Sequence, residues 1–265
     1  MTITTAGGPT YLGLLPVGTD AVTDGRSRVS RWARIHLHWW MGLLAPIVDR
    51  GRALGISRAA PISMVLALAS LVVTGLVRIA SPARHQLAGI LSYRGQDLYD
   101  GQLWKLVSGG LLAQSWSQWL WTLFVAVIVF AALEVRVGGP MLLAAAFAGQ
   151  VISTVAVAWL APLIGHAEQL AHEDVGTSCL VVAAAAALAW VRRSLLLTGV
   201  ILSSLLVDGF LSAPATAVEH CVAVATGALV MVAAPAGRRP RDRVPASARA
   251  FMVAALTAAS GTEGR

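Results

Sequence analysis

VGGPMLLAAAFAGQVISTVAVAWLAPLIGHA, residues 137–167, contains no Asp, Glu, Lys or Arg. At a rise of about 1.5 Å per residue, a helix of this length exceeds the ~30 Å of hydrocarbon in a bilayer. Outward from it along the chain, further charge-free runs occupy residues 59–77, 106–133, 175–191, 194–207 and 220–237. The 265 residues are 57% hydrophobic and only 12% charged, about half the charge of a soluble domain. The pattern predicts an all-α polytopic membrane protein with six transmembrane helices and excludes a soluble globular enzyme.

The arginines indicate how the chain crosses the membrane, because short loops rich in Lys and Arg stay cytoplasmic. Basic residues alternate along the chain with segments 164–174 and 209–219, which lack Lys and Arg. The basic positions are Arg136, Arg192 with Arg193, and arginine clusters before and after the apolar region. We therefore expect both termini on the cytoplasmic side. Arginine supplies every basic residue except Lys105, a bias typical of a high-GC bacterium, so the expected location is a bacterial plasma membrane.

One outer loop, residues 78–111, departs from this charge rule because it carries four basic residues. It also contains Tyr93, Tyr99, Trp104 and several leucines. Aromatic and apolar residues of this kind favour the membrane interface. We expect a structured element in the outer leaflet here instead of a bare connection.

The ends of the chain differ from the apolar middle. Residues 1–25 are rich in Gly, Thr and Pro and predict a flexible tail that lacks signal-peptide features. Residues 26–58 interleave arginines with tryptophans, which predicts a cytoplasmic amphipathic helix in the membrane interface, with a seventh span as the alternative. Residues 59–237 then form the six-helix domain, and residues 238–265 form a basic cytoplasmic tail. The net charge of +7 lies beside the apolar runs, so it indicates a lipid bilayer and not nucleic acid as the partner.

Two polar residues near the outer ends of the fourth and sixth spans are candidates for chemistry, because such groups are costly in hydrocarbon. Ser178 lies 14 residues before Arg192 and His220 lies 18 residues before Arg238, so both are roughly 21–27 Å from the inner flank. On neighbouring helices they would form a nucleophile and its general base. Gly176 leaves the backbone open to a substrate, and a helix N-terminus offers N–H donors to an oxyanion. Alternatively, Ser178 is one of the small residues through which membrane helices pack.

Four short motifs between residues 101 and 237 resemble a known family. They are, in order, GQLWKLVS at 101–108, Leu133-Glu134 followed by Gly138, GTS at 176–178, and His220 with Gly227. Their residue types and order resemble those of the rhomboid intramembrane serine proteases and their inactive relatives. The resemblance implies a rhomboid-like six-helix bundle in which Ser178 attacks the scissile carbonyl and His220 carries the proton, as a dyad without a carboxylate. It also implies a membrane-spanning segment as the substrate, and it calls for no cofactor and no metal.

The chain departs from the family around this dyad. By the resemblance, Gln118 and Thr122 take the places of a histidine and an asparagine that hold the oxyanion, and both can still donate hydrogen bonds. Cys179 and Val182 replace a glycine and a tyrosine beside the dyad. Two main hypotheses follow: an intramembrane serine endopeptidase, or an inactive pseudoprotease that binds transmembrane helices as a subunit or sorting factor of a membrane complex. A small-solute channel or transporter is a third interpretation.

Two acidic residues near the candidate site receive ordinary interpretations. Glu219 adjoins His220 but points about 100° away on a helix, so we expect it to face the outer water. Asp208 is expected to mark the outer end of the fifth span. The acidic and histidine residues of segment 164–174 lack the spacing of metal ligands and predict a solvated loop.

Overall fold

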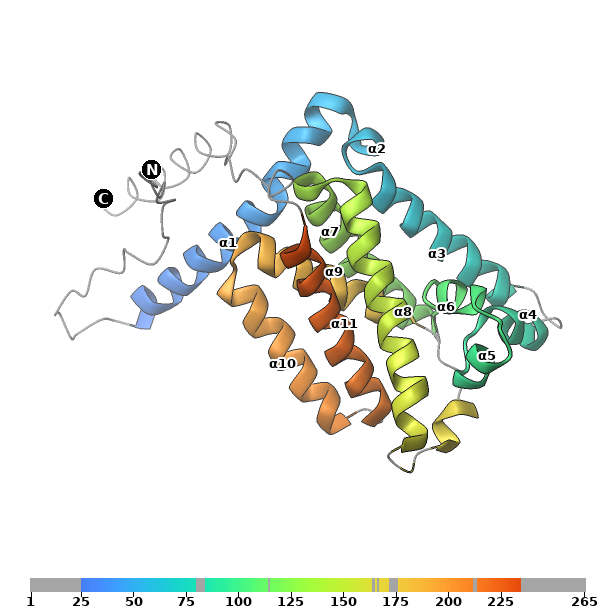
Figure 1. Ribbon diagram of the computed structural model, residues 1–265. Helices are drawn as coiled ribbons and strands as arrows, with labels where there is room; N and C mark the ends of the chain where they lie inside the picture. The colour runs from blue at the N-terminus through green and yellow to red at the C-terminus, as the bar shows by residue number, and fades with distance from the viewer. Residues whose placement is uncertain are drawn as a thin grey trace, which may run out of the picture. The chain divides into compact units, whose positions relative to one another are not determined.

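The computed structural model describes residues 25–79, 84–113, 115–163, 165, 167–171, 176–211 and 214–234. This part of the chain is almost entirely helical (Figure 1). The chain divides into two compact units, residues 1–40 and 41–265, and each is considered by itself below. Apart from Gly25, the tails expected at 1–25 and 238–265 lie outside the described residues.

Helix α1 (Gly25–Leu54) begins in the first unit and continues past Pro46 in the second. In the first unit, the rings of Trp39 and Trp40 meet edge to face, with centroids 4.9 Å apart. Helix α1 covers most of the segment 26–58, for which an interfacial amphipathic helix was expected, and it ends at Leu54. Gly55 adopts a φ of 84°, which glycine tolerates far better than other residues, and the separate short helix α2 (Ile56–Ala59) follows.

Four helices of the second unit are long and apolar enough to cross a membrane: α3 (Pro61–Ile79), α7 (Trp116–Val137), α8 (Gly139–Leu163) and α11 (Pro214–Ala233). Two apolar helices are shorter, α9 (Ser178–Arg192) and α10 (Leu195–Leu211). Each of the six charge-free runs of the sequence thus overlaps one of these apolar helices. Large apolar side chains remain exposed on their surfaces, including Phe210, at 86%. These features define a helical, membrane-embedded protein.

Helix α9 is enclosed by its neighbours. It contacts α7, α8, α10 and α11, and ten of its fifteen residues are buried, including the whole run from Ala183 to Ala187. Fifteen helical residues span only about 22 Å. Helix α9 is therefore shorter than α7, α8 and α11, which surround it. Ser178 lies in the first turn of this enclosed helix.

Close packing of small residues sets the relative heights of α8, α9 and α11. A side-chain carbon added at Gly227 would overlap the backbone of Ala183, and one added at Gly149 would overlap the Ala183 side chain. Cys179, Ala183 and Ala223 form one buried cluster. Contact through Gly and Ala lets helix backbones approach closely and pack without a water-driven force.

The long segment before α7 is structured, as expected from its composition. It contains α4 (Arg84–Leu91), α5 (Gly95–Tyr99) and α6 (Trp104–Gly109). The Lys105 ammonium lies 2.9 Å from the Asp97 carboxylate, with both side chains about nine-tenths buried. The Ser108 hydroxyl donates to the Leu91 carbonyl at 2.8 Å. This buried ion pair and hydrogen bond join the three short helices to one another.

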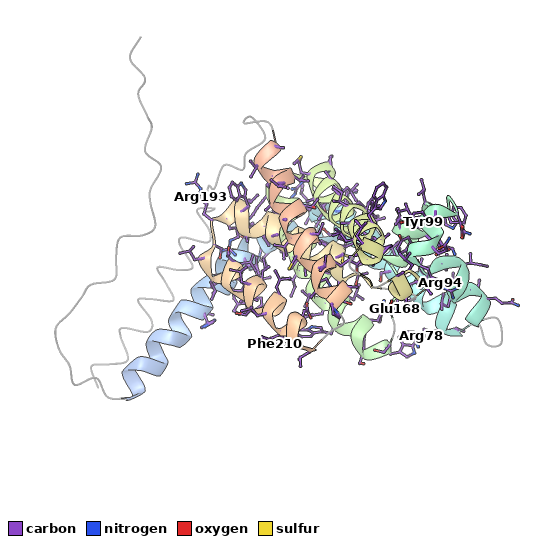
Figure 2. All side chains as sticks on the ribbon, turned by 60° about the horizontal axis from the view of Figure 1, so that its bottom comes forward. Arg78, Arg94, Tyr99, Glu168, Arg193 and Phe210 are labelled. Atoms are coloured by element: carbon purple, nitrogen blue, oxygen red, sulfur yellow. The ribbon has the colours of Figure 1, made fainter. Side chains whose placement is uncertain are left out.

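The same segment is anchored to the rest of the second unit. The Tyr99 hydroxyl donates to the Ala158 carbonyl of α8 at 3.3 Å, and Gly95 packs against Leu170 in the 3-10 helix η1 (Ala167–Ala171). Figure 2 shows Arg94, Tyr99 and Glu168 together on one side of the molecule and Arg193 on the opposite side. The two loops that precede Ser178 in the sequence, one with α4 to α6 and the other with η1, therefore lie together at one end of the helices.

Glu134 joins α7 to the beginning of α3. Its carboxylate accepts hydrogen bonds from the Ile62 N–H at 3.0 Å, the Ser63 N–H at 2.8 Å and the Ser63 hydroxyl at 2.6 Å. Glu134 is only 3% exposed. A carboxylate at this place satisfies backbone donors that a helix N-terminus leaves without partners, and it complements the helix dipole.

A tight turn joins α9 to α10. Arg193 adopts a left-handed conformation, with φ 48° and ψ 41°, and its N–H donates to the Trp190 carbonyl at 3.1 Å. The Ser194 hydroxyl accepts from the Leu197 N–H at 3.2 Å and so caps α10. The turn reverses the chain within two residues, so α9 and α10 are antiparallel neighbours.

Candidate active site

Ser178 is the first residue of α9, directly after the N-cap Thr177. It is half-buried. The Gly176 N–H donates to the Gly109 carbonyl at 3.1 Å, which attaches the approach to α9 to the end of α6. Because this N–H is already used, the donors offered to an anion come from the first turn of α9, whose N–H groups have no acceptor within the helix.

His220 lies on α11 and is 7% exposed. Its Nδ1 is 2.6 Å from Oδ2 of Asp208 on α10. Its Nε2 is buried and has no hydrogen-bond partner. A buried polar atom without a partner is costly and is uncommon in folded proteins. One ring nitrogen is thus held and the other is left open to a further group.

The packing of α9 against α11 brings Ser178 and His220 to similar heights. Cys179 clusters with Ala223, and Ala183 packs against Gly227, so the two helices run parallel. Ser178 precedes Cys179 by one residue and His220 precedes Ala223 by three, which puts them about 1.5 and 4.5 Å beyond this contact. Among the described residues, no hydrogen bond joins Ser178 to His220. In catalytic sites without substrate such bonds are often long or absent.

The other two oxyanion candidates are located only by their backbone. Gln118 and Thr122 lie one turn apart in the first half of α7, which also contacts α9. Their side chains lie outside the described residues, so their part in the site stays a prediction.

The pairing of Asp208 with His220 is what sequence reasoning missed, since Asp208 was expected to mark the end of a span, with a place in a water-lined cavity as the alternative. Asp208 is the one acidic residue in the apolar run from 194 to 218. Twelve residues later, after the break between α10 and α11, comes His220. A helical hairpin puts two such residues at the same end, and ionisable groups in membrane helices usually pair. That combination was the available signal.

Glu219 corrects a second expectation. It is 7% exposed within the protein and does not face outer water. The reason is its helical phase: Glu219, Ala223 and Thr226 follow the spacing i, i+4, i+7 and form one stripe of α11, and all three are buried. This stripe also leaves Glu219 on a different side of the helix from the Nδ1 contact of His220.

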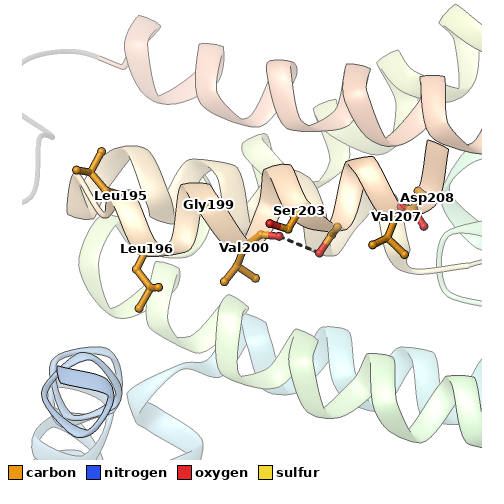
Figure 3. Close-up of a pocket in the computed structure, with 8 residues that line it drawn as sticks. Leu195, Leu196, Gly199, Val200, Ser203, Val207 and Asp208 are labelled. Carbon is orange, nitrogen blue, oxygen red and sulfur yellow. Dashed lines mark hydrogen bonds between the residues drawn. The ribbon is translucent and has the colours of Figure 1, made fainter. Parts of the chain in front are cut away.

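A shallow groove of about 710 Å³, wide open and lined by α10 alone, follows this helix towards the site (Figure 3). Its wall runs from Leu195 and Leu196 at one end to Asp208 at the other. The Ser204 hydroxyl in the groove donates to the Val200 carbonyl of its own helix at 3.0 Å. The groove is therefore mainly apolar, with a carboxylate at the end beside His220.

No protein-family model matches the chain, and no curated protein is found similar to it. The fold and the apolar helices define the class, a helical membrane-embedded protein. A more specific assignment depends on the chemistry of the residues around Ser178 and His220.

Proposed function

We propose that the protein is a rhomboid-like intramembrane serine endopeptidase that cleaves transmembrane segments, with Ser178 as nucleophile and His220 as general base. One observation carries the proposal: His220 has Nδ1 bound by Asp208 and Nε2 buried without a partner. It lies at the height of Ser178 on the helix packed against α9. An imidazole held in this way is arranged to take a proton from a nearby hydroxyl.

The reaction proceeds in two halves. His220 Nε2 takes the proton of the Ser178 hydroxyl while Oγ bonds to the carbonyl carbon of the scissile peptide. The carbon–nitrogen bond then breaks, and the proton passes from Nε2 to the leaving amine. In the second half, a water molecule loses a proton to Nε2 as its oxygen attacks the acyl carbon. The bond between Oγ and that carbon breaks, Oγ regains the proton, and the carboxylic acid is released.

Developing negative charge on the carbonyl oxygen needs hydrogen-bond donors. The first-turn N–H groups of α9 supply these together with the positive end of the helix dipole. We assign the side chains of Gln118 and Thr122 as further donors, since an amide and a hydroxyl can both fill this role. Gly176, next to the nucleophile, leaves space for the substrate backbone.

The arrangement in the membrane belongs to the same proposal. All six apolar helices, α3 and α7 to α11, cross a bacterial plasma membrane, and both termini lie in the cytoplasm. The short length of α9 is consistent with a site inside the membrane. A helix of about 22 Å that starts at the inner face ends below the outer surface of ~30 Å of hydrocarbon, so Ser178 lies below that surface. Water and a membrane-spanning substrate then meet above Ser178. The N-terminal part of α1 lies in the inner interface.

Labelling with a fluorophosphonate tests the nucleophile without knowledge of the substrate. The full chain in detergent is compared with Ser178→Ala and His220→Ala, and Ser203→Ala on α10 is the matched control because its serine is exposed. We expect labelling of wild type and the control and none of the two site variants. Unlabelled but folded wild type would reject an activated serine.

A second candidate function is supported by two observations. Ser178 and His220 share no hydrogen bond, and an apolar groove follows α10. A pseudoprotease would use such a groove to bind a partner's transmembrane helix. It predicts that a membrane protein co-purifies equally with wild type and Ser178→Ala, while Gly199→Leu, which fills the groove, releases it. Loss of the partner with Ser178→Ala would count against this function.

A further inference from the structure

We propose that Asp208 is a positioning residue for His220, so that the site works as a carboxylate–histidine–serine arrangement and not as the dyad that the family resemblance implies. The catalytic meaning of this inference rests on the proposed protease function. The pairing of Asp208 with His220 concerns the ring itself and is tested separately.

The contact between the two residues is short and well protected. Asp208 Oδ2 lies 2.6 Å from His220 Nδ1, and the side chains are 29% and 9% exposed. Charge-assisted hydrogen bonds are shorter and about twice as strong as neutral ones. Partial burial reduces the competition from water for this bond. Asp208 therefore determines how the ring is turned.

The carboxylate also selects the tautomer. An ionised carboxylate only accepts hydrogen bonds, so the proton of the neutral ring resides on Nδ1. Nε2 then carries a bare lone pair, and it is the nitrogen that is buried without a partner. A bare Nε2 is the form that can remove a proton from a hydroxyl, whereas an Nε2–H cannot. The carboxylate of Asp208 stabilises the imidazolium formed when Nε2 receives the proton.

The position of Asp208 in the fold supports a specific role. It reaches His220 from a different helix, α10, whereas the adjacent acid Glu219 lies on the buried stripe of α11 with Ala223 and Thr226. Asp208 is also the single acid of its apolar run. A charged residue there is unfavourable unless it is paired, and the ring nitrogen supplies the partner.

The test combines a spectroscopic measurement with labelling. The full chain, grown with ring-¹⁵N histidine and held in detergent micelles, gives ¹⁵N signals that separate protonated from bare ring nitrogens; the His220 signals are assigned by their loss in His220→Gln. Asp208→Asn keeps the shape and removes the charge, Asp208→Glu restores it, and Ser204→Ala is the control one helical turn away. Thermal unfolding checks that each variant is folded.

We expect wild type, Ser204→Ala and Asp208→Glu to show a protonated Nδ1 and a bare Nε2 at a pH where the ring is neutral. Asp208→Asn shifts the proton towards Nε2, because its amide can donate to Nδ1. The fluorophosphonate labelling rate then falls by about 10²-fold or more in Asp208→Asn, the usual size of a general-base contribution, and Asp208→Glu recovers most of it.

Failures of the two proposals look different. If wild type labels at Ser178 but Asp208→Asn has the wild-type rate or an unchanged tautomer, the role of Asp208 is overturned and the protease stands. If wild type does not label at all, the proposed protease function is rejected, and the ¹⁵N measurement alone tests the role of Asp208. A proton shift in Asp208→Asn then supports the positioning of His220 by Asp208, and an unchanged tautomer overturns it.

Discussion

Replacing Glu134 by Gln is expected to destabilise the helix bundle by about 1–5 kcal/mol, summed from one lost backbone hydrogen bond and the lost charge. The two carboxylate oxygens accept three hydrogen bonds from Ile62 and Ser63. A glutamine amide offers one acceptor oxygen, so in either orientation at least one backbone N–H of α3 is left without an acceptor. A buried unsatisfied donor costs about 1–3 kcal/mol. Loss of the negative charge at the helix N-terminus adds about 0.3–2 kcal/mol.

Equilibrium unfolding in mixed micelles, followed by circular dichroism as the denaturing detergent increases, measures this free energy. Asp100→Asn is the control, because Asp100 is an exposed acid, and we expect it to change stability by less than about 0.5 kcal/mol. Ser63→Ala removes one of the three bonds and is expected to cost about 1–2 kcal/mol, near the upper end of hydrogen bonds between membrane helices. The double variant should cost less than the sum. A Glu134→Gln protein as stable as wild type would refute the assigned capping role.

Three further predictions use the same unfolding measurement. Gly227→Ala forces a side chain into the Ala183 backbone and should cost about 1–3 kcal/mol or more, whereas Gly75→Ala, which meets nothing within 4 Å, should be neutral or stabilising by about 0.5–1 kcal/mol; equal effects would contradict the packing argument. Lys105→Met leaves the buried Asp97 carboxylate without its cation and should cost about 3–5 kcal/mol, with partial recovery when Asp97→Asn is added; no recovery would show that the charge is not the cause. Gly55→Ala should cost about 1–3 kcal/mol because its φ of 84° and ψ of 150° lie in a region that is essentially restricted to glycine, and an unchanged midpoint would contradict this.

Much of the fold follows from the hydropathy of the sequence. Each of the six charge-free runs overlaps one apolar helix, and the aromatic-rich segment 78–111 contains α4, α5 and α6, because both properties depend on local composition. The end of α1 at Leu54 was not predicted, since the pattern of arginines and tryptophans carries no signal for the positive φ that Gly55 adopts. The residue pattern of this segment predicts a helix but does not predict the backbone conformation that ends it.

The candidate site was predicted in part. Similar heights of Ser178 and His220 could be estimated by counting residues from the arginines, and the contact of α9 with α11 agrees with that estimate. The hydrogen bond between Asp208 and His220 depends on how α10 is rotated against α11, which hydropathy does not determine. Glu219 was expected to face the outer water, but it lies on the buried stripe of α11 with Ala223 and Thr226. Hydropathy does not determine which stripe of a helix its neighbours cover.

Arg193 is unfavourable for the backbone conformation of the α9–α10 turn, but its charge is favourable for the proposed membrane topology. Its left-handed conformation, with φ 48°, is one that glycine would adopt with about 1–2 kcal/mol less strain. The Arg193 side chain is exposed and does not contribute to the geometry of the turn. In the proposed topology, however, the positive charge at this turn keeps the α9–α10 hairpin from being threaded through the membrane the wrong way round. The orientation of the hairpin is set during synthesis, before α9 packs against its neighbouring helices. In that topology, the folded protein retains a strained residue whose charge acts while the chain is being inserted.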